Sequence, residues 1–305
     1  MRVVTVAAAQ MGPVVQSESR SEVVERMIAM LETSARHGAD LVVFPELALT
    51  TFFPRWYFEE DAELDAYYER EMPGPETAPL FAKAKQLGVG FSLGYAELTP
   101  DGRRFNTAIL VGPDGSVLGK YRKIHLPGTK EPIGDREFEH LEKRYFEVGD
   151  LGFPTFETPS GRFGMCICND RRWPETFRVM ALKGAEVFML GYNTPTRNIH
   201  HPEPAHLREF HHRLSIESAA YQNAAWVMAA AKCGPEDGFA MIGGSAIVAP
   251  TGEVAVRAIS EEDEVITHNC DLDLGAYIRR SVFDFARHRR IEHYGPITAQ
   301  TGIEV

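Results

Sequence analysis

Residues 163–175 read Phe-Gly-Met-Cys-Ile-Cys-Asn-Asp-Arg-Arg-Trp-Pro-Glu, which predicts a strand, a turn and the start of a helix in succession. The apolar run ends at Ile167, and Pro174 followed by Glu175 has the form of a first helical turn. Cys168 falls in the turn, at the carboxyl end of the strand, where open α/β sheets expose catalytic groups. A strand that leads directly into a helix indicates an α/β protein.

The rest of the chain alternates between short apolar runs and segments with helical spacing. Strands are expected at 3–9, 41–44, 89–95, 108–112, 117–123, 163–167, 187–191, 226–230, 245–248 and 264–271, and helices at 19–37, 80–87, 174–183 and 205–222. Ser19 with Glu22 has the form of a capping box, and Asp114 with Gly115 indicates a hairpin turn. Strands interleaved with helices predict an α/β fold. No Ser/Gly-rich or Pro-rich linker divides the chain, so a single domain, 1–305, is expected.

The charge and cysteine content exclude several classes of protein. The formal net charge of −11 is spread along the chain, whereas a nucleic-acid surface would show a basic stripe. The cysteines Cys166, Cys168, Cys233 and Cys270 are too few and too scattered for a disulfide framework. No apolar run approaches the ~18 residues of a membrane span, and no secretory signal opens the chain. We therefore expect a reduced, cytoplasmic protein without nucleic-acid or membrane partners.

The thiol of Cys168 is the first candidate for chemistry. Cationic groups or a helix N-terminus nearby would favour its thiolate, which is the reactive form. A buried structural cysteine explains the local residues equally well. Cys166 lies within the strand and is interpreted as a core residue, although alternation alone does not show which way its side chain points.

Two further stretches carry candidate residues. Glu46 comes just after an apolar strand, where desolvation would raise the pKa of its carboxyl towards that of a general base. Taken alone, Glu46 is more simply interpreted as a solvated loop residue. Residues 119–128 read Gly-Lys-Tyr-Arg-Lys-Ile-His-Leu-Pro-Gly, which taken alone is a solvated basic strand. Its glycine pattern does not resemble a phosphate-binding loop.

Together these stretches resemble the signatures of the carbon–nitrogen hydrolase (nitrilase) superfamily. Phe-Pro-Glu at 44–46, Lys-Tyr-Arg-Lys-Ile-His-Leu at 120–126 and Cys-Asn-Asp-Arg-Arg-Trp-Pro-Glu at 168–175 are similar to its Glu, Lys and Cys motifs, in order and at the family's spacing. Within the superfamily the chain most resembles the N-carbamoyl-D-amino acid amidohydrolases, through residues 46–56, 71–75, 140–146, 191–195 and 263–267. The similarity runs from about residue 3 to Gly295. Residues 130–139 and 196–208 are less typical, so the preferred substrate side chain stays open.

The resemblance implies a four-layer α-β-β-α sandwich that commonly assembles into larger oligomers, so a homodimer or homotetramer is expected. It also implies a catalytic triad of Glu46, Lys123 and Cys168. Glu46 would accept the thiol proton and later activate water, and Lys123 would stabilise the thiolate and the oxyanion together with a backbone N–H just after Cys168. The implied reaction converts N-carbamoyl-D-amino acids to D-amino acid, ammonia and carbon dioxide through a covalent thioester-type intermediate, without a metal or organic cofactor.

The same resemblance assigns further roles. Glu142 matches a fourth acidic residue near the nucleophile, and an exposed helical Glu beside Lys143 is the alternative interpretation. Arg171 and Arg172 would bind the substrate carboxylate, since a guanidinium can do so through two parallel hydrogen bonds. Arg172 corresponds to an arginine common in relatives and is the more structural of the two, which makes Arg171 the more diagnostic. The remaining matches to substrate-binding positions are Asn169, His125, His140, Asn193 and Thr194.

Alternative functions remain open at this stage. The His-rich stretch from His200 to His212 could suggest zinc, but it contains no His-Glu-x-x-His and no accompanying Cys-x-x-Cys, so a loop and helix at the site rim or a subunit contact is favoured. A β-ureidopropionase-like or carbamoylputrescine hydrolase, an aliphatic amidase or a nitrilase would use the same triad. A non-catalytic scaffold with this fold would be expected to lack a triad residue, and the chain has all three.

Overall fold

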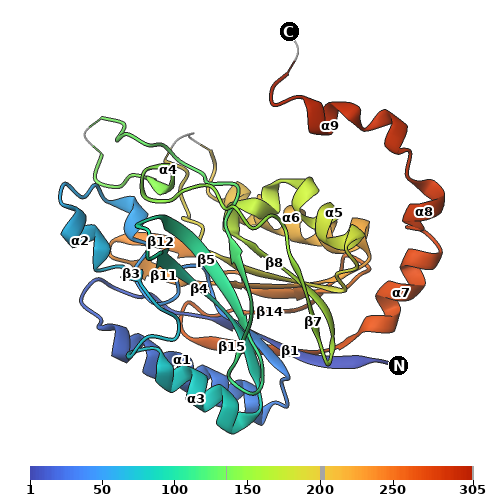
Figure 1. The fold of residues 1–305 in the computed structure, drawn as a ribbon, viewed down its shortest axis with the longest axis horizontal. Coiled ribbons are helices and arrows are strands. Elements are labelled where there is room, and N and C mark those ends of the chain that lie inside the picture. The colour runs from blue at the N-terminus through green and yellow to red at the C-terminus, as the bar shows by residue number, and fades with distance from the viewer. Residues whose placement is uncertain (135, 200–202, 304–305) are drawn as a thin grey trace.

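Two large β-sheets lie face to face in the computed structural model, which describes residues 1–134, 136–199 and 203–303 (Figure 1). The first sheet contains β1 (Val3–Gln10), β2 (Leu41–Val43), β3 (Tyr68–Glu69), β4 (Gly90–Leu98), β5 (Arg104–Val111), β6 (Val117–Arg122) and β15 (Glu264–Asp271). The second contains β7 (Thr155–Thr158), β8 (Gly161–Ile167), β9 (Val187–Tyr192), β10 (Trp226–Ala231), β13 (Ala246–Val248) and β14 (Val254–Arg257). Their strand orders are β15-β1-β2-β4-β5-β6, with β3 beside β4, and β14-β13-β10-β9-β8-β7.

Helices cover the outer face of each sheet. The first sheet carries α1 (Arg20–Arg36) and α3 (Ala78–Leu87), and the second carries α5 (Pro174–Leu182) and α6 (His206–Asn223) (Figure 1). The period-two alternation of β1 explains this layering, because Val4, Val6 and Ala8 pack in the cluster that includes the second sheet. Ala7 and Ala9 pack with α1 and α3 instead. The predicted α-β-β-α sandwich is therefore confirmed.

Most of the expected elements are present with bounds shifted by a few residues. The predicted capping box at the start of α1 is confirmed, since Ser19 and Glu22 cap one another reciprocally. The predicted hairpin at Asp114 and Gly115 is also confirmed, because β5 and β6 pair antiparallel around it. The described helices include none that is long and apolar enough to cross a membrane.

Several shorter elements were not predicted. They are the strands β3, β7 and β14, the helices α2 (Asp61–Asp65) and α4 (Glu142–Tyr145), the hairpin β11 (Cys233–Glu236) and β12 (Phe239–Ile242), and the terminal helices α7 (Leu272–Arg280), α8 (Phe285–His288) and α9 (Gly295–Ala299). The last three follow one another in an arc at one side of the molecule (Figure 1). Short 3-10 turns occupy Phe53–Arg55, Cys168–Arg172 and Ile291–His293.

Candidate active site

Glu46 lies in the segment that leaves β2 and passes between the two sheets. A Cβ atom on Gly94 of β4 would come within 2.7 Å of the Glu46 Cα, and one on Gly191 of β9 within 2.8 Å of the Glu46 backbone nitrogen. The two glycines therefore allow the backbone of Glu46 to approach both strands closely. The next residue, Leu47, has a φ of 44°, a left-handed conformation that its surroundings must stabilise. Glu46 is completely buried, not solvated.

Lys123 directly follows β6 and joins two buried carboxylates. Its Nζ lies 2.6 Å from Glu46 Oε1 and 2.6 Å from Glu142 Oε2. Burial alone would lower the pKa of Lys123, but the negative charges of Glu142 and Glu46 outweigh this effect and raise it. Burial raises the pKa of Glu46 more than the charge of Lys123 lowers it, so Glu46 is the more basic carboxylate. Lys123 is therefore held as a cation between two acids.

Glu142 is at the start of the short helix α4 and is completely buried, so it is not an exposed helical residue. Burial would raise the pKa of its carboxyl, but the charge of Lys123 and the hydrogen bond with His140 outweigh burial and lower it. The His140 Nε2 lies 3.0 Å from Glu142 Oε1. The side chain of Asn106 donates to Glu46 Oε1 at 2.8 Å and contacts Glu142 Oε2 at 3.4 Å. These contacts leave Glu142 an anion that fixes Lys123.

Cys168 occupies the turn between β8 and α5, as the sequence predicted. Its φ of 46° is left-handed, and the backbone N–H of Ile167 donates to Asp170 Oδ2 at 2.9 Å, which stabilises this sharp turn. Cys168 is 6% exposed, and its thiol donates to the Asn193 carbonyl at 3.2 Å. Burial and the negative charge of Glu46 raise the pKa of Cys168 to about 11, although Lys123 and Arg171 oppose them. These surroundings therefore favour the neutral thiol over the thiolate.

Asn193, just after β9, connects the acid and the thiol. Its backbone N–H donates to Glu46 Oε2 at 3.0 Å and its side-chain amide donates to the Glu46 carbonyl at 2.7 Å. Its own carbonyl accepts from Cys168. The structure thus brings the expected residues Glu46, Lys123, Glu142 and Cys168 into one buried cluster, with Asn193 against Glu46.

The two arginines after Cys168 differ in their surroundings. Arg171 is buried and donates to the Cys168 carbonyl at 2.7 Å and to Thr194 Oγ1 at 2.8 Å. Arg172 is exposed and has no hydrogen bond or ion pair to the residues that the structure describes. Partial desolvation and the charges of Arg171 and Arg208 lower the pKa of Arg172 to about 10. Of these two arginines, Arg172 therefore has no counter-ion among the described residues, whereas Arg171 holds the turn that carries Cys168.

His125 and Asn169 lie on another side of the turn. The Nδ1 of His125 is 2.8 Å from Asp170 Oδ1, and its ring stacks on Trp173 with centroids 4.9 Å apart. Asn169 donates to the His125 carbonyl at 3.0 Å. His125, Asn169 and Trp173 line a hollow of about 1110 Å³ that also reaches Arg144. This hollow approaches the turn from the side of α4.

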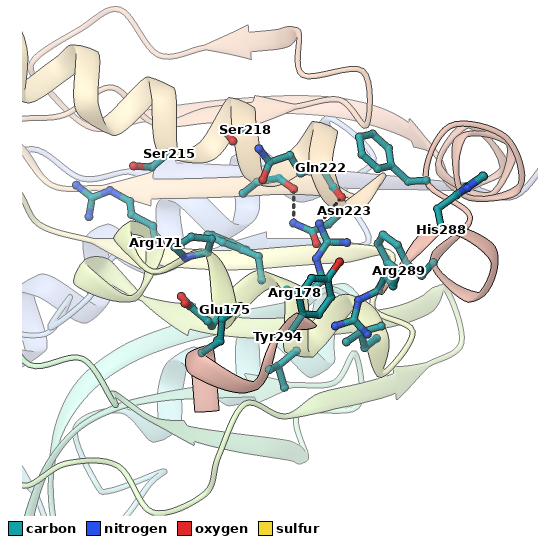
Figure 2. A pocket seen from close by; sticks show the side chains of 18 of the residues that line it. Arg171, Glu175, Arg178, Ser215, Ser218, Gln222, Asn223, His288, Arg289 and Tyr294 are labelled. Atoms are coloured by element: carbon teal, nitrogen blue, oxygen red, sulfur yellow. Dashed lines mark hydrogen bonds between the residues drawn. The ribbon is translucent and has the colours of Figure 1, made fainter. Parts of the chain in front are cut away.

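A second hollow, of about 800 Å³, lies between α5, α6 and the C-terminal segment (Figure 2). Arg171 and Arg172 belong to its lining, but Cys168 does not. The guanidinium of Arg171 is turned away from Arg178 and Arg289 on the far side of this hollow (Figure 2). Four of the expected substrate residues therefore border two different hollows, with Arg171 and Arg172 at one and His125 and Asn169 at the other. His140, Asn193 and Thr194 line neither hollow.

The His-rich stretch is partly described. His200 and His201 lie outside the described residues, while His206, His211 and His212 belong to α6. His212 is buried, with Nε2 2.9 Å from the Tyr192 hydroxyl. Within 1–134, 136–199 and 203–303, no three His, Cys, Asp or Glu side chains gather in a group that could hold a metal ion.

Two residues that the sequence interpretation missed complete the cluster. Asn106 bridges Glu46 and Glu142, and Asp170 accepts from Tyr121, Ile167 and His125. A signal was present for Asn106, because it is a polar residue one position after Phe105 in the strand β5, whose last four residues are all apolar. Asp170 lies inside the quoted motif, but the sequence does not show that its carboxylate accepts the hydrogen bonds that shape the turn.

Comparison with known proteins gives matches over almost the whole chain. The family model for carbon–nitrogen hydrolases matches residues 5–280. A nitrilase from Pyrococcus abyssi is 33% identical over 293 residues, covering 95% of this chain and 99% of the relative. The N-carbamoylputrescine amidase of Solanum lycopersicum is 30% identical, with 89% and 87% of the two chains covered. The omega-amidase NIT2 of Xenopus tropicalis is 32% identical, with 91% and 93% covered.

Solved structures agree with the fold. The crystal structure of a carbon–nitrogen hydrolase from Helicobacter pylori G27 has a TM-score of 0.84 and 26% identity, and covers 98% of this chain and 99% of its own. An amidase from Nesterenkonia has a TM-score of 0.70 at 20% identity, with 92% and 95% covered. The chain therefore belongs to the carbon–nitrogen hydrolase family.

Proposed function

We propose that this enzyme hydrolyses N-carbamoyl-D-amino acids to D-amino acid, ammonia and carbon dioxide, with Cys168 as the nucleophile. The supporting observation is the buried cluster in which Lys123 contacts Glu46 and Glu142 while Asn193 contacts both Glu46 and Cys168. The preference for D substrates rests on the motifs that resemble N-carbamoyl-D-amino acid amidohydrolases.

The proposed chemistry has two halves. Glu46 takes the thiol proton as Cys168 attacks the carbamoyl carbon, and the tetrahedral oxyanion is stabilised by Lys123 and a backbone N–H. Collapse expels a nitrogen leaving group, which receives the proton from Glu46, and leaves a covalent thioester-type intermediate. Glu46 then activates water for its hydrolysis, which frees the Cys168 thiol and releases a carbamic acid. The carbamic acid loses carbon dioxide and so yields the second nitrogen product. Since burial raises the pKa of Glu46, this carboxylate accepts a proton more readily than a solvated one.

The sequence made Arg171 the more diagnostic of the two arginines, but Arg171 already donates to the Cys168 carbonyl and to Thr194, so the substrate carboxylate is assigned to Arg172 instead. Arg208 adds positive charge nearby, and its ion pair with Glu203 spans 3.2 Å. This cationic surrounding disfavours a substrate that bears an ammonium group, such as N-carbamoylputrescine. It favours a carboxylate-bearing substrate.

The test is a panel of initial rates with N-carbamoyl-D- and L-amino acids, N-carbamoyl-β-alanine, N-carbamoylputrescine and simple aliphatic amides. We expect the N-carbamoyl-D-amino acids to have the highest kcat/KM.

In Arg172→Ala, KM for these substrates should rise about 10- to 100-fold, because a charge-assisted contact is worth about 1.5–3 kcal/mol. Equal kcat/KM for carboxylate-free amides, or an unchanged KM in the variant, would overturn the assignment.

A further inference from the structure

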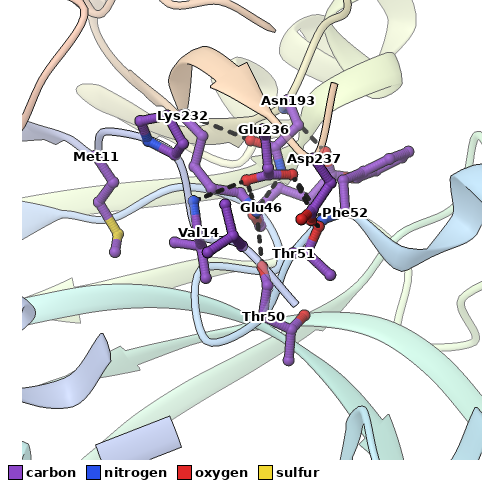
Figure 3. Close-up of polar contacts among 12 residues, drawn as sticks. Met11, Val14, Glu46, Thr50, Thr51, Phe52, Asn193, Lys232, Glu236 and Asp237 are labelled. Carbon is purple, nitrogen blue, oxygen red and sulfur yellow. Dashed lines mark hydrogen bonds and ion pairs between the residues drawn. The ribbon is translucent and has the colours of Figure 1, made fainter. Parts of the chain in front are cut away.

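A second buried cluster of charges lies beside the segment that carries Glu46. Arg55 is 1% exposed, and Lys232 and Glu236 are fully buried. Both cations pair with one acid, since Arg55 Nη2 lies 2.6 Å from Glu236 Oε1 and Lys232 Nζ lies 2.8 Å from Glu236 Oε2. Figure 3 shows Lys232 and Glu236 adjacent to Glu46 and Asn193. The proposed reaction assigns no role to this cluster.

The cluster holds the backbone downstream of Glu46. The N–H of Phe52 donates to Glu236 Oε1 at 2.7 Å, and the ammonium of Lys232 donates to the Thr50 carbonyl at 2.7 Å (Figure 3). The Thr51 hydroxyl donates to Asp237 Oδ2 at 2.7 Å. Residues 50–52 are thus fixed by directional contacts from the β11–β12 hairpin, only a few residues beyond the left-handed Leu47.

A second connection reaches Glu46 from the other side. The backbone N–H of Lys232 donates to Asn193 Oδ1 at 3.3 Å, and Asn193 in turn donates to the carboxylate and the carbonyl of Glu46. Lys232 therefore contacts both the segment after Glu46 and the residue that orients its carboxylate.

Stabilisation of the fold alone does not explain such a cluster of buried charges. Burying these charges costs solvation energy, and apolar side chains of similar volume often stabilise a core equally well. The ion pairs instead make the contacts directional. Each donor must face its acceptor, so the backbone is held in one position. We propose that Glu236 and Lys232 are positioning residues, which fix the Glu46 carboxylate against Lys123 and beside Cys168.

This inference rests on the proposed role of Glu46 as the base. A displaced Glu46 would impair both proton transfers, whereas the contact of Arg172 with substrate would persist. We therefore expect kcat to fall about 10²-fold in the double variant Lys232→Met/Glu236→Gln, since a displacement of ~1 Å can have this effect. KM should change less than about threefold. The double variant removes one charge of each sign and nearly preserves side-chain volume. Because Arg55 then contacts a neutral amide in place of a carboxylate, the folded state of the variant is checked by circular dichroism.

The decisive readout is the pH dependence of Cys168 alkylation by iodoacetamide, because the charge of Glu46 helps to raise the pKa of this thiol. The alkylation profile should shift to lower pH in Lys232→Met/Glu236→Gln, because a displaced Glu46 raises the pKa of the thiol less. It should stay unchanged in a matched control, Arg26→Met/Asp263→Asn, which removes an ion pair of 2.8 Å between α1 and the residue just before β15. If the first variant does not fold, Thr51→Val replaces a hydroxyl with a methyl group of similar size and should shift the profile in the same direction.

An alkylation profile and a kcat like those of the wild type, in a folded variant, would overturn the positioning role. Alkylation needs no substrate, so this outcome is distinct from failure of the proposed function. Absence of carbamoyl hydrolysis by the wild-type enzyme would overturn only the substrate assignment.

Discussion

At the scale of single residues, Cys166 and Cys168 provide a matched pair of thiols in and just after β8. Cys166 is packed in the core, whereas Cys168 is at the turn beside Asn193. We expect Cys168→Ala to abolish turnover while the protein stays folded. Cys166→Ala should keep kcat and lose about 1–2 kcal/mol of unfolding free energy through a small cavity. Measurements of initial rates and of thermal unfolding distinguish the two variants. The reverse pattern would show that Cys166, and not Cys168, is the nucleophile.

At this scale the sequence predicts which residues act but not how they are placed. The motifs identify Glu46, Lys123 and Cys168, but they do not reveal that these residues are buried or which residues they contact. Local residues favoured a solvated Glu46, because no local pattern reveals that Gly94 and Gly191 let its segment pass between two sheets. Lys232 and Glu236 carried no motif, and their meeting with Arg55 depends on tertiary packing.

At the scale of elements, Gly191 of β9 tests how closely this strand must approach the Glu46 segment. The Cβ in Gly191→Ala would lie 2.8 Å from the Glu46 backbone nitrogen, so the segment must shift. We expect a loss of about 1–3 kcal/mol in unfolding free energy and a fall in kcat. Gly295→Ala is the control, since its Cβ would meet nothing within 4 Å. Wild-type kcat in Gly191→Ala would contradict the required close approach.

Elements with a clear hydrophobic periodicity or a local cap or turn signal are predicted well from the sequence. Elements without such a signal are not predicted. The capped helix α1 and the β5–β6 hairpin follow from local signals, since Ser19 with Glu22 and Asp114 with Gly115 act within a few residues. The β11–β12 hairpin is short and contains Pro235, so its sequence has little strand signal. The terminal helices α8 and α9 have no buried residues and hence no apolar stripe to detect.

At the scale of the whole molecule, His212 couples the α6 layer to the second sheet and makes stability depend on pH. Burial and the charge of Arg171 lower the pKa of His212 well below its ordinary value of 6.5. The unfolded chain therefore binds a proton near pH 6.5 that the folded protein does not, so this contribution is complete above pH 6.5 and is lost as the pH falls. We expect a decrease of about 1.4 kcal/mol per pH unit from this group.

Denaturant titrations between pH 7.5 and about 5 measure this slope. In His212→Gln the unfolding free energy should fall less steeply with pH, by the contribution of one proton, about 1.4 kcal/mol per pH unit. The glutamine amide can still contact the Tyr192 hydroxyl, but it does not titrate. An identical slope in wild type and variant would show that His212 is not the source.

The convergence of Glu46, Lys123 and Cys168 between the two sheets is tested most directly by mass spectrometry of a rapidly quenched reaction with an N-carbamoyl-D-amino acid. The account predicts a covalent acyl adduct on the peptide that contains both Cys166 and Cys168, localised to Cys168 by fragmentation and absent in Cys168→Ala. An adduct on Cys166, or hydrolysis that persists in Cys168→Ala without any adduct, would contradict it.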